Sequence, residues 1–228
     1  GRTEQIGGTL HEGVEAQIRK VQPMLELRVP FELARTEMEA IRRGAKDADL
    51  EPVTDAAQKI ALAEDKAVFR GCAAGKIVGI GEAAEGAAMT LSEDFTEYPK
   101  TVAGAISKLR FAGVDGPYAI ALGPRCYEGL TETTGSGGYR VYDHVVRLLD
   151  GPAIWAPAID GAVVLSLRGG DFEIVVGQDI SIGYLDHTTE SVRLYLQESF
   201  TFRVHAGEAA VPLVYAASGR RSAAGGRS

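Results

Sequence analysis

Apolar and polar positions alternate strictly in LELRVPF, residues 25–31, near the start of the chain. A period of two is typical of a strand that buries one face. Upstream, GGTLHEG at residues 7–13 interrupts the alternation in the manner of a hairpin tip. We therefore expect residues 1–33 to form a long, polar, two-stranded arm. Because an isolated hairpin is only marginally stable in water, such an arm has to lie on another surface.

Three later segments have the wider apolar spacing of amphipathic helices. The strongest pattern predicts a helix over residues 52–70, with Asp49 and the proline of the first turn as start signals and Gly71 as the stop signal. At 1.5 Å per residue, this helix would be roughly 30 Å long. Shorter patterns predict helices over residues 37–43 and 99–113.

Beyond residue 117 the expected elements become shorter. YAIAL predicts a strand, PRCYEGL a helical turn and YRVYDHVVRLL a helix. AVVLSLRGG and FEIVVG are expected to pair as a hairpin across Gly169, Gly170 and Asp171. Strict alternation then predicts a very long strand over residues 191–204, with residues 209–216 as its neighbour. A long helix combined with long antiparallel strands indicates the α+β class.

The composition narrows the possible function classes. A net charge of −7 argues against a dedicated nucleic-acid binder, which would carry a basic stripe. Cys72 and Cys126 form no CxxC pair, so neither a disulfide framework nor a zinc site is indicated, and sparse cysteine suits a reducing cytoplasm. No apolar run reaches the roughly 20 residues of a membrane span. The first residue is not methionine, so we expect the N-terminus to be incomplete, and we expect residues 218–228 to be a disordered tail.

The sequence offers no constellation that predicts catalysis. Its four histidines lie in separate elements without the spacing of metal ligands. Asp143 and His144 could belong to a relay, but no serine stands in a strand–turn–helix elbow to be activated by them. The glycines of GIGEAAEG miss the GxGxxG spacing of a phosphate-binding loop. We therefore expect a protein that is not an enzyme and has no cofactor or metal; a protease would need a serine, cysteine or metal centre that the sequence does not assemble.

Several stretches, taken together, resemble the encapsulins, also called linocin-type bacteriocin proteins. The matching segments follow the family's order and spacing: QPMLELRVPFEL, AEDKAVFRG, GVDGPYAIALGP, RGGDFEIVVGQDISIGY and VRLYLQESFTFRV. They extend over nearly all of residues 14–215. The chain is thereby identified as a member of the type 1 group of encapsulins, in an N-terminally incomplete form. The resemblance implies the fold of tailed-phage capsid proteins of the Hong Kong 97 type.

The resemblance also implies a structural function. Encapsulins self-assemble into an icosahedral shell in the prokaryotic cytoplasm, and the shell encloses a ferritin-like or peroxidase cargo for iron storage or protection from oxidative stress. The implied partners are further copies of the chain and a cargo protein held by a short targeting peptide, with no nucleic acid and no membrane. A prophage major capsid protein that encloses nucleic acid has the same fold and is the alternative. The acidic net charge favours the compartment, because a lumen that faces DNA usually needs basic residues.

Carried over to this chain, the family's architecture has an arm and two domains. Residues 1–33 correspond to the extended loop, or arm, which lies on the neighbouring subunit. Residues 34–118 and 183–217 correspond to the peripheral domain. Residues 119–182 correspond to the axial domain, which gathers around the symmetry axes, and the disordered tail, residues 218–228, follows.

Three sets of site residues follow from the same resemblance. The loop at the five-fold pore consists of Thr134, Gly135, Ser136, Gly137, Gly138 and Tyr139. The groove for the cargo's targeting peptide is assigned to Ile180, Ile182 and Tyr184; alternatively, these three side chains fill the core of the peripheral domain. The inter-subunit face of the arm is assigned to Leu25, Leu27 and Val29, which we expect to find no partner within one subunit.

Two departures from the family limit what the resemblance implies. Members begin with an N-terminal helix and arm that help to form the cargo pocket, and we expect this chain to lack that segment. Some members bind flavin beside a tryptophan in the helix after the arm; Thr36 stands at that position here, so flavin is not implied. The sequence determines neither the identity of the cargo nor the size of the shell.

Overall fold

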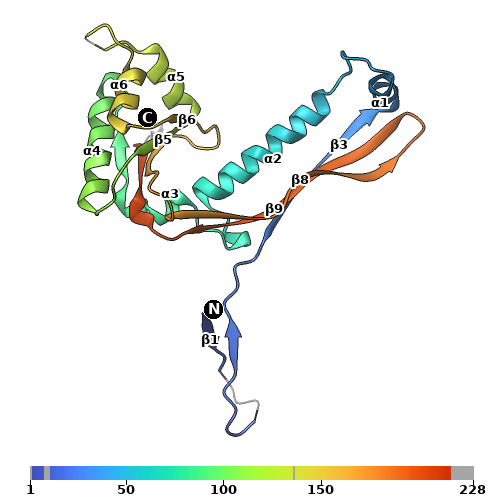
Figure 1. Ribbon diagram of the computed structural model, residues 1–228, viewed down its shortest axis with the longest axis horizontal. Helices are drawn as coiled ribbons and strands as arrows, with labels where there is room; N and C mark the ends of the chain where they lie inside the picture. The colour runs from blue at the N-terminus through green and yellow to red at the C-terminus, as the bar shows by residue number, and fades with distance from the viewer. Residues whose placement is uncertain (1, 8–10, 136, 217–228) are drawn as a thin grey trace, which may run out of the picture.

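The computed structural model, which describes residues 2–7, 11–135 and 137–216, contains a two-stranded ribbon, a three-stranded sheet and a five-stranded sheet (Figure 1). The five-stranded sheet and its helices form a compact body. The three-stranded sheet and helix α2 extend from this body as a long limb, and the ribbon projects away from the root of the limb. The mixture of helices and sheets confirms the α+β class. The expected tail, residues 218–228, lies outside the described residues.

The three-stranded sheet is antiparallel, with β9 in the middle. It consists of β3 (Leu25–Ala34), β9 (Ser191–Val204) and β8 (Phe172–His187). β8 turns back into β9, whereas β7 (Ala162–Ser166) belongs to the other sheet, so the expected hairpin across Gly169–Asp171 is wrong. The physical reason is the length of the partner: β9 alternates over 14 residues and offers β8 a far longer ladder than the 5 residues of β7.

Helix α2 (Glu51–Arg70) has the ends that the sequence predicts. Pro52 lies in its first turn, and Asp49 Oδ1 accepts a hydrogen bond from the Glu51 amide at 3.0 Å. Gly71 ends the helix with a φ of 85°, which glycine adopts at little steric cost. The sequence signals therefore act locally, as expected.

The limb is held together by the contact between α2 and one face of the sheet. Alternation in β3 and β9 directs apolar side chains toward the helix. The buried cluster between them consists of Phe31, Leu33, Ala56, Ile60 and Leu196. Burial of each large side chain in this cluster contributes about 2 kcal/mol. Helix α1 (Arg35–Arg42) follows β3 directly, at the far end of the limb (Figure 1).

The body is built on the five-stranded sheet. In order across the sheet, its strands are β4 (Met89–Leu91), β10 (Ala210–Tyr215), β7, β5 (Tyr118–Leu122) and β6 (Ala153–Trp155). Its helices are α3 (Ile80–Ala83), α4 (Tyr98–Phe111), α5 (Pro124–Glu132) and α6 (Val141–Leu149), with short 3-10 turns at Ala73–Gly75, Glu85–Ala87, Phe95–Glu97 and Gly207–Ala209. Every residue of β5 is buried, which is typical of a strand covered on both faces.

The last strand corrects a second expectation, that residues 209–216 lie beside residues 191–204. β10 pairs with β4 and β7 instead. Its first four residues are all buried, so it needs a sheet that is covered on both faces, which the limb does not provide. The five-stranded sheet therefore includes two strands from outside residues 119–182, and β8 runs through the expected boundary after residue 182. The division into axial and peripheral domains at these residues stays a prediction.

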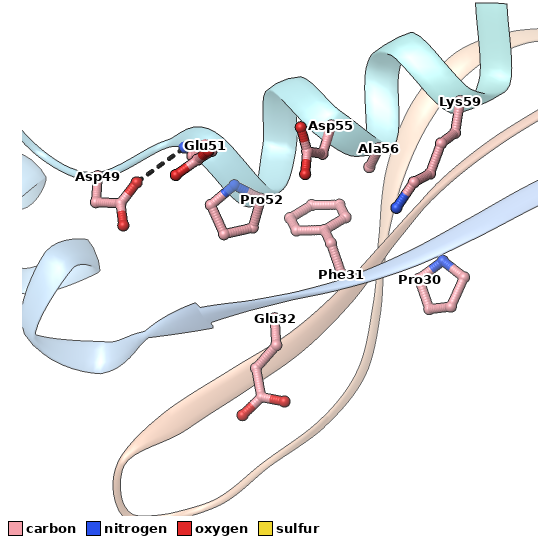
Figure 2. Close-up of a pocket in the computed structure, with 9 residues that line it drawn as sticks. All are labelled: Pro30, Phe31, Glu32, Asp49, Glu51, Pro52, Asp55, Ala56 and Lys59. Carbon is pink, nitrogen blue, oxygen red and sulfur yellow. Dashed lines mark hydrogen bonds between the residues drawn. The ribbon is translucent and has the colours of Figure 1, made fainter. Parts of the chain in front are cut away.

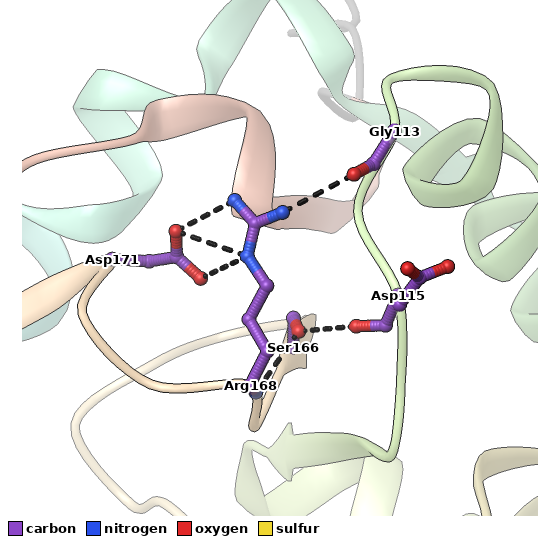
Figure 3. A network of polar contacts seen from close by, with 5 residues as sticks. All are labelled: Gly113, Asp115, Ser166, Arg168 and Asp171. Atoms are coloured by element: carbon purple, nitrogen blue, oxygen red, sulfur yellow. Dashed lines mark hydrogen bonds and ion pairs between the residues drawn. The ribbon is translucent and has the colours of Figure 1, made fainter.

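The RGGD turn, Arg168–Asp171, fixes the connection between body and limb (Figure 3). The Arg168 guanidinium donates to both carboxylate oxygens of the buried Asp171, at 2.8 and 2.9 Å, and to the Gly113 carbonyl at 3.2 Å. Ser166 Oγ donates to the Asp115 carbonyl at 2.6 Å. A buried carboxylate is tolerated when it is paired in this way. The contacts of this turn therefore stabilise the fold and do not form a reactive site.

Candidate assembly and docking surfaces

The N-terminal ribbon carries apolar side chains that its own subunit does not bury. It consists of β1 (Thr3–Gln5) and β2 (Gln17–Arg19), which pair with each other and lie away from the body (Figure 1). The exposed apolar side chains of the ribbon and of the segment that joins it to β3 are Ile6, Val14, Ile18, Val21 and Met24. Val21 is 77% exposed. A row of this kind on a projecting element marks a surface that another chain covers.

The side chains assigned to the inter-subunit face of the arm have partners in their own subunit. Leu25, Leu27 and Val29 belong to β3 and are half-buried against the apolar clusters of the limb and the body. The expectation that they find no partner within one subunit is therefore wrong. The reason is that β3 pairs along its whole length with β9 and so shares the cover of α2. The free apolar side chains begin before residue 25.

Strand β8 presents an uncovered apolar strip. The ladder with β9 pairs Ile182 with Leu196 and Tyr184 with Leu194, so all four side chains point to the α2 face of the sheet. Helix α2 packs on β3 and β9, and leaves Ile182 and Tyr184 exposed. The alternative that these side chains fill the core does not hold within the single subunit.

Ile180 lies beside the strip in an irregular part of the ladder. The register shifts between Val176 and Gln178 and again between Gln178 and Ser181, so Ile180 stands in a bulge rather than in strict alternation. Its side chain is exposed, and its amide donates to Asp179 Oδ1 at 2.8 Å. The strip continues beyond the bulge with exposed Ile174 and Val176. β8 is also an edge strand, with one side of its backbone unpaired in the sheet.

The strip ends at a hollow of about 480 Å³ between β8 and α1. Tyr184 and His187 line it from β8, and the Tyr184 hydroxyl forms a hydrogen bond with His187 Nδ1. Arg35 and Arg42 line it from the side of α1. The surface around the strip is therefore concave at this end, and Glu39 beside the two arginines gives its rim charges of both signs.

The expected pore loop connects α5 to α6 and is held by its own backbone. Gly135 donates its amide to the Tyr139 carbonyl at 2.9 Å, and Gly138 donates to the Gly135 carbonyl at 3.0 Å. Thr134 and Arg140 form an isolated β-bridge, and Tyr139 is 75% exposed. Ser136 lies outside the described residues. The loop thus presents an aromatic side chain and backbone to solvent without contributing to the core.

A cavity of about 580 Å³ lies under this loop, between α6 and the start of α4. Gly135, Gly137 and Tyr139 form one wall of it. The opposite walls carry the charged and polar side chains of Thr96, Arg140, Asp143, His144 and Arg147. Asp143 and His144 thus face solvent beside two arginines, and the described residues that line the cavity include no serine or cysteine to serve as a nucleophile.

A further hollow of about 350 Å³ lies at the start of α2 (Figure 2). Asp49, Glu51 and Asp55 form an acidic rim with Lys59 beside them, while Glu32 points away from the helix. In the part of the chain that the structure describes, no histidine, cysteine, serine or threonine lines this hollow. These carboxylates stabilise α2, because negative charge near the N-terminal end of a helix interacts favourably with the helix dipole.

One buried ionisable group, Glu198 on β9, was not expected from the sequence. Its side chain points to the α2 face, is 6% exposed as a residue, and its Oε1 finds no hydrogen-bond donor among the described residues. Burial, together with the nearby carboxylates of Glu64 and Asp179, raises the pKa of the Glu198 carboxyl to about 7. The signal was present: Glu198 is the one charged residue in the apolar row of LYLQESFTF.

The described residues do not bring together the ligands of a metal site. Among the described residues, no group of three or more histidine, cysteine, aspartate or glutamate side chains is placed to hold a metal ion. Cys126 is buried in a cluster of hydroxyls: its Sγ lies 3.4 Å from both the Tyr98 and the Tyr215 hydroxyl, and burial raises the pKa of Tyr215 to about 12. None of the described helices has the length and apolar character to cross a bilayer.

Comparison with known sequences gives a consistent picture. A family profile described as an encapsulating protein for peroxidase matches residues 1–201. A type 1 encapsulin shell protein of Rhodospirillum rubrum is 55% identical over 218 residues, which cover 93% of this chain and 78% of the relative. A type 1 encapsulin shell protein of Mycobacterium tuberculosis is 49% identical over 201 residues, 88% of this chain and 76% of the relative.

Comparison with solved structures addresses the fold alone. A virus-like particle from Pyrococcus furiosus matches with a TM-score of 0.63 at 20% identity, covering 92% of this chain and 86% of that one. A structure of Mycobacterium phage Cain matches with a TM-score of 0.60 at 16% identity, covering 95% and 83%. The expected capsid fold of the Hong Kong 97 type is confirmed.

Proposed function

This chain belongs to the type 1 encapsulin shell proteins, and on that premise we propose that it forms a closed icosahedral shell around a cargo enzyme in the bacterial cytoplasm. A capsid-like assembly of identical copies follows from the family and the fold. The proposals for the cargo's docking site and for the pore rest on the exposed strip of β8 and on the loop between α5 and α6.

The observation that carries the assembly is the projecting ribbon. The apolar side chains of the ribbon and of the segment that joins it to β3 stay exposed in the single subunit, and Val21 is the most exposed of them. A contact between the ribbon of one copy and a different surface of the next is heterologous, and it closes into a ring or shell when the rotation between copies closes. The ribbon thus links each subunit to its neighbour.

The uncovered strip of β8 is the proposed docking site for the cargo's targeting peptide. Ile180, Ile182 and Tyr184 are exposed, apolar and next to the hollow beside α1. A short extended or partly apolar peptide binds such an edge through side-chain pockets and backbone hydrogen bonds. Many identical sites inside one shell would raise the effective affinity for an oligomeric cargo.

The cargo is a ferritin-like protein or a peroxidase, and the compartment serves iron storage or protection from oxidative stress. The description of the matching family names a peroxidase as the enclosed protein, which supports this class. The residues Thr134–Tyr139 line the opening at the five-fold axis through which small solutes reach the cargo. The support for this placement is the exposed, self-contained loop between α5 and α6.

The shell encloses protein rather than nucleic acid. The net charge of −7 supports this, because packaged DNA needs basic residues on the surface that faces it. Purified particles test the proposal: their absorbance ratio at 260 and 280 nm and their response to nuclease distinguish nucleic acid from protein contents. Particles that release nucleic acid on disassembly would instead support a prophage capsid.

A further inference from the structure

Glu198 interrupts the apolar face of β9 that packs under α2. Its neighbours on that face, Leu196 and Phe200, are buried as an ordinary core requires. Glu198 is buried with them, yet its Oε1 has no hydrogen-bond donor among the described residues. A buried carboxylate without a partner is unfavourable when it is ionised and far less so when it is protonated.

Helix α2 and strand β8 each place a charged group near Glu198, and both groups are acidic. Helix α2 supplies Glu64, and β8 supplies Asp179. Burial raises the pKa of Glu64, and the neighbouring carboxylates of Asp65 and Asp179 add to that rise. β3 turns Leu27 to this face, opposite Glu198, while its charged Glu26 and Arg28 lie on the other face.

Two parts of the limb meet at this carboxyl, and a third touches one of them from the opposite face of the sheet. The middle of α2 lies on one side through Glu64. The bulge of β8 at Gln178 lies opposite Ser199, the residue after Glu198. The arm touches this bulge from the other face of the sheet: a Cβ added at Gly177 would lie 2.7 Å from Met24 Cε and 2.9 Å from Ser199 Oγ.

From these contacts we infer that Glu198 is a proton-operated latch between α2 and the β8 bulge. With its proton in place, Glu198 is neutral, and α2 packs on one face of the β8 bulge while Met24, at the root of the arm, lies on its other face. When the proton leaves, the negative charge on Glu198 faces those of Glu64 and Asp179, and the packing of the bulge and arm root loosens. The latch would therefore adjust how firmly each subunit holds the ribbon that links it to its neighbour.

The sign of the pH dependence follows from the raised pKa. In the folded chain the Glu198 carboxyl has a pKa of about 7, against an ordinary value of 4.5 in the unfolded chain. The stabilisation from the protonated carboxyl is complete below pH 4.5 and is lost as the pH rises to about 7. Because half of the folded chains still hold the proton at that pH, the loss is complete only at about pH 8.

The test uses Glu198→Gln, which keeps the shape of the side chain and removes its charge. Two readouts are compared at each pH between about 4.5 and about 8.5: the melting temperature, and hydrogen exchange of the amides at residues 177–181 and in the middle of α2. At about pH 8 the Glu198→Gln chain should melt higher than the wild type and exchange these amides about tenfold more slowly. At about pH 4.5 the two chains should agree in both readouts.

Glu26→Gln is the matched control, since Glu26 lies on the opposite face of the adjacent strand. It should leave both pH profiles unchanged. Glu64→Gln is the independent variant: by removing one repelling charge, it should lower the pKa of Glu198 and so move the wild-type loss of protection to lower pH. The latch is refuted if Glu198→Gln retains the wild-type pH profile, or if the bulge amides exchange at the wild-type rate at about pH 8. If Glu198→Gln does not fold, an unshifted profile in Glu64→Gln refutes it as well.

Discussion

Ile182 of β8 and Leu196 of β9 are direct partners across one antiparallel ladder and point to the same face, yet Leu196 is 4% exposed and Ile182 is 62% exposed. The difference arises because α2 packs on β3 and β9 and not over β8. One continuous apolar face is therefore divided into a core half and a half that is free for a partner. This division underlies the assignment of the β8 strip as a docking surface.

Replacing Ile182 with Asp should remove cargo without preventing assembly. The carboxylate would stand in water in the single subunit, so its cost to folding is small, but it would have to be desolvated under an apolar peptide. We expect full-size particles from the full-length chain, with co-purifying cargo reduced at least tenfold in gel densitometry. Particles that retain their full cargo load would contradict the assignment.

Leu196→Asp is the matched control on the buried side of the same pair. Here the carboxylate would be forced under α2, at a cost of several kcal/mol. We expect no soluble particles, and a chain that melts far below the wild type in calorimetry. Equal effects of the two substitutions would show that the two positions share one environment, contrary to the structure.

Replacing Val21 with Asp should weaken assembly and leave the subunit folded. Val21 is exposed and touches no buried cluster among the described residues, so the free energy of unfolding of the subunit should change by less than about 0.5 kcal/mol. Sedimentation should show a shift from particles toward small species. The control Val21→Thr retains the shape of the side chain and should lose less assembly; particles unaffected by the aspartate would place the inter-subunit contact elsewhere.

Replacing Tyr139 with Asp should alter permeability and not stability. The side chain is exposed at the tip of a loop that its own backbone holds, so the melting temperature should stay within about 2 °C of the wild type. With a negative charge at each copy of the pore, iodide should quench an enclosed fluorophore more slowly. Tyr139→Asn controls for the loss of the ring, and equal quenching in the two variants would place the loop away from the pore.

Replacing Asp171 with Asn should destabilise every subunit. The substitution removes the charge that the Arg168 guanidinium pairs with, so the free energy of unfolding should fall. Chemical denaturation of the dissociated chain measures this loss. Asp115→Asn is the control, because the network uses only the backbone carbonyl of Asp115 (Figure 3), and its effect should stay within about 0.5 kcal/mol.

Local patterns predicted individual elements better than their partners. The helix at residues 52–70 and the strand at residues 191–204 are correct because apolar period and end signals are local properties. The expected partners of β7 and β10 are wrong because pairing depends on which strands the helices of the body cover. The alternating pattern of β8 could not predict that Ile182 is exposed. Its exposure depends on how many strands of the sheet α2 covers, which is not a local property of the sequence. Glu198 could have been found as the single charge in an apolar row.

We expect this chain to close into a shell through its projecting ribbon. Electron microscopy of the purified chain, beside a variant that lacks residues 1–22, tests it most directly. The chain with its ribbon should form uniform closed particles. The deletion should give monomers or small oligomers whose circular dichroism still shows a folded body and limb. Full-size closed particles from the deletion would contradict it.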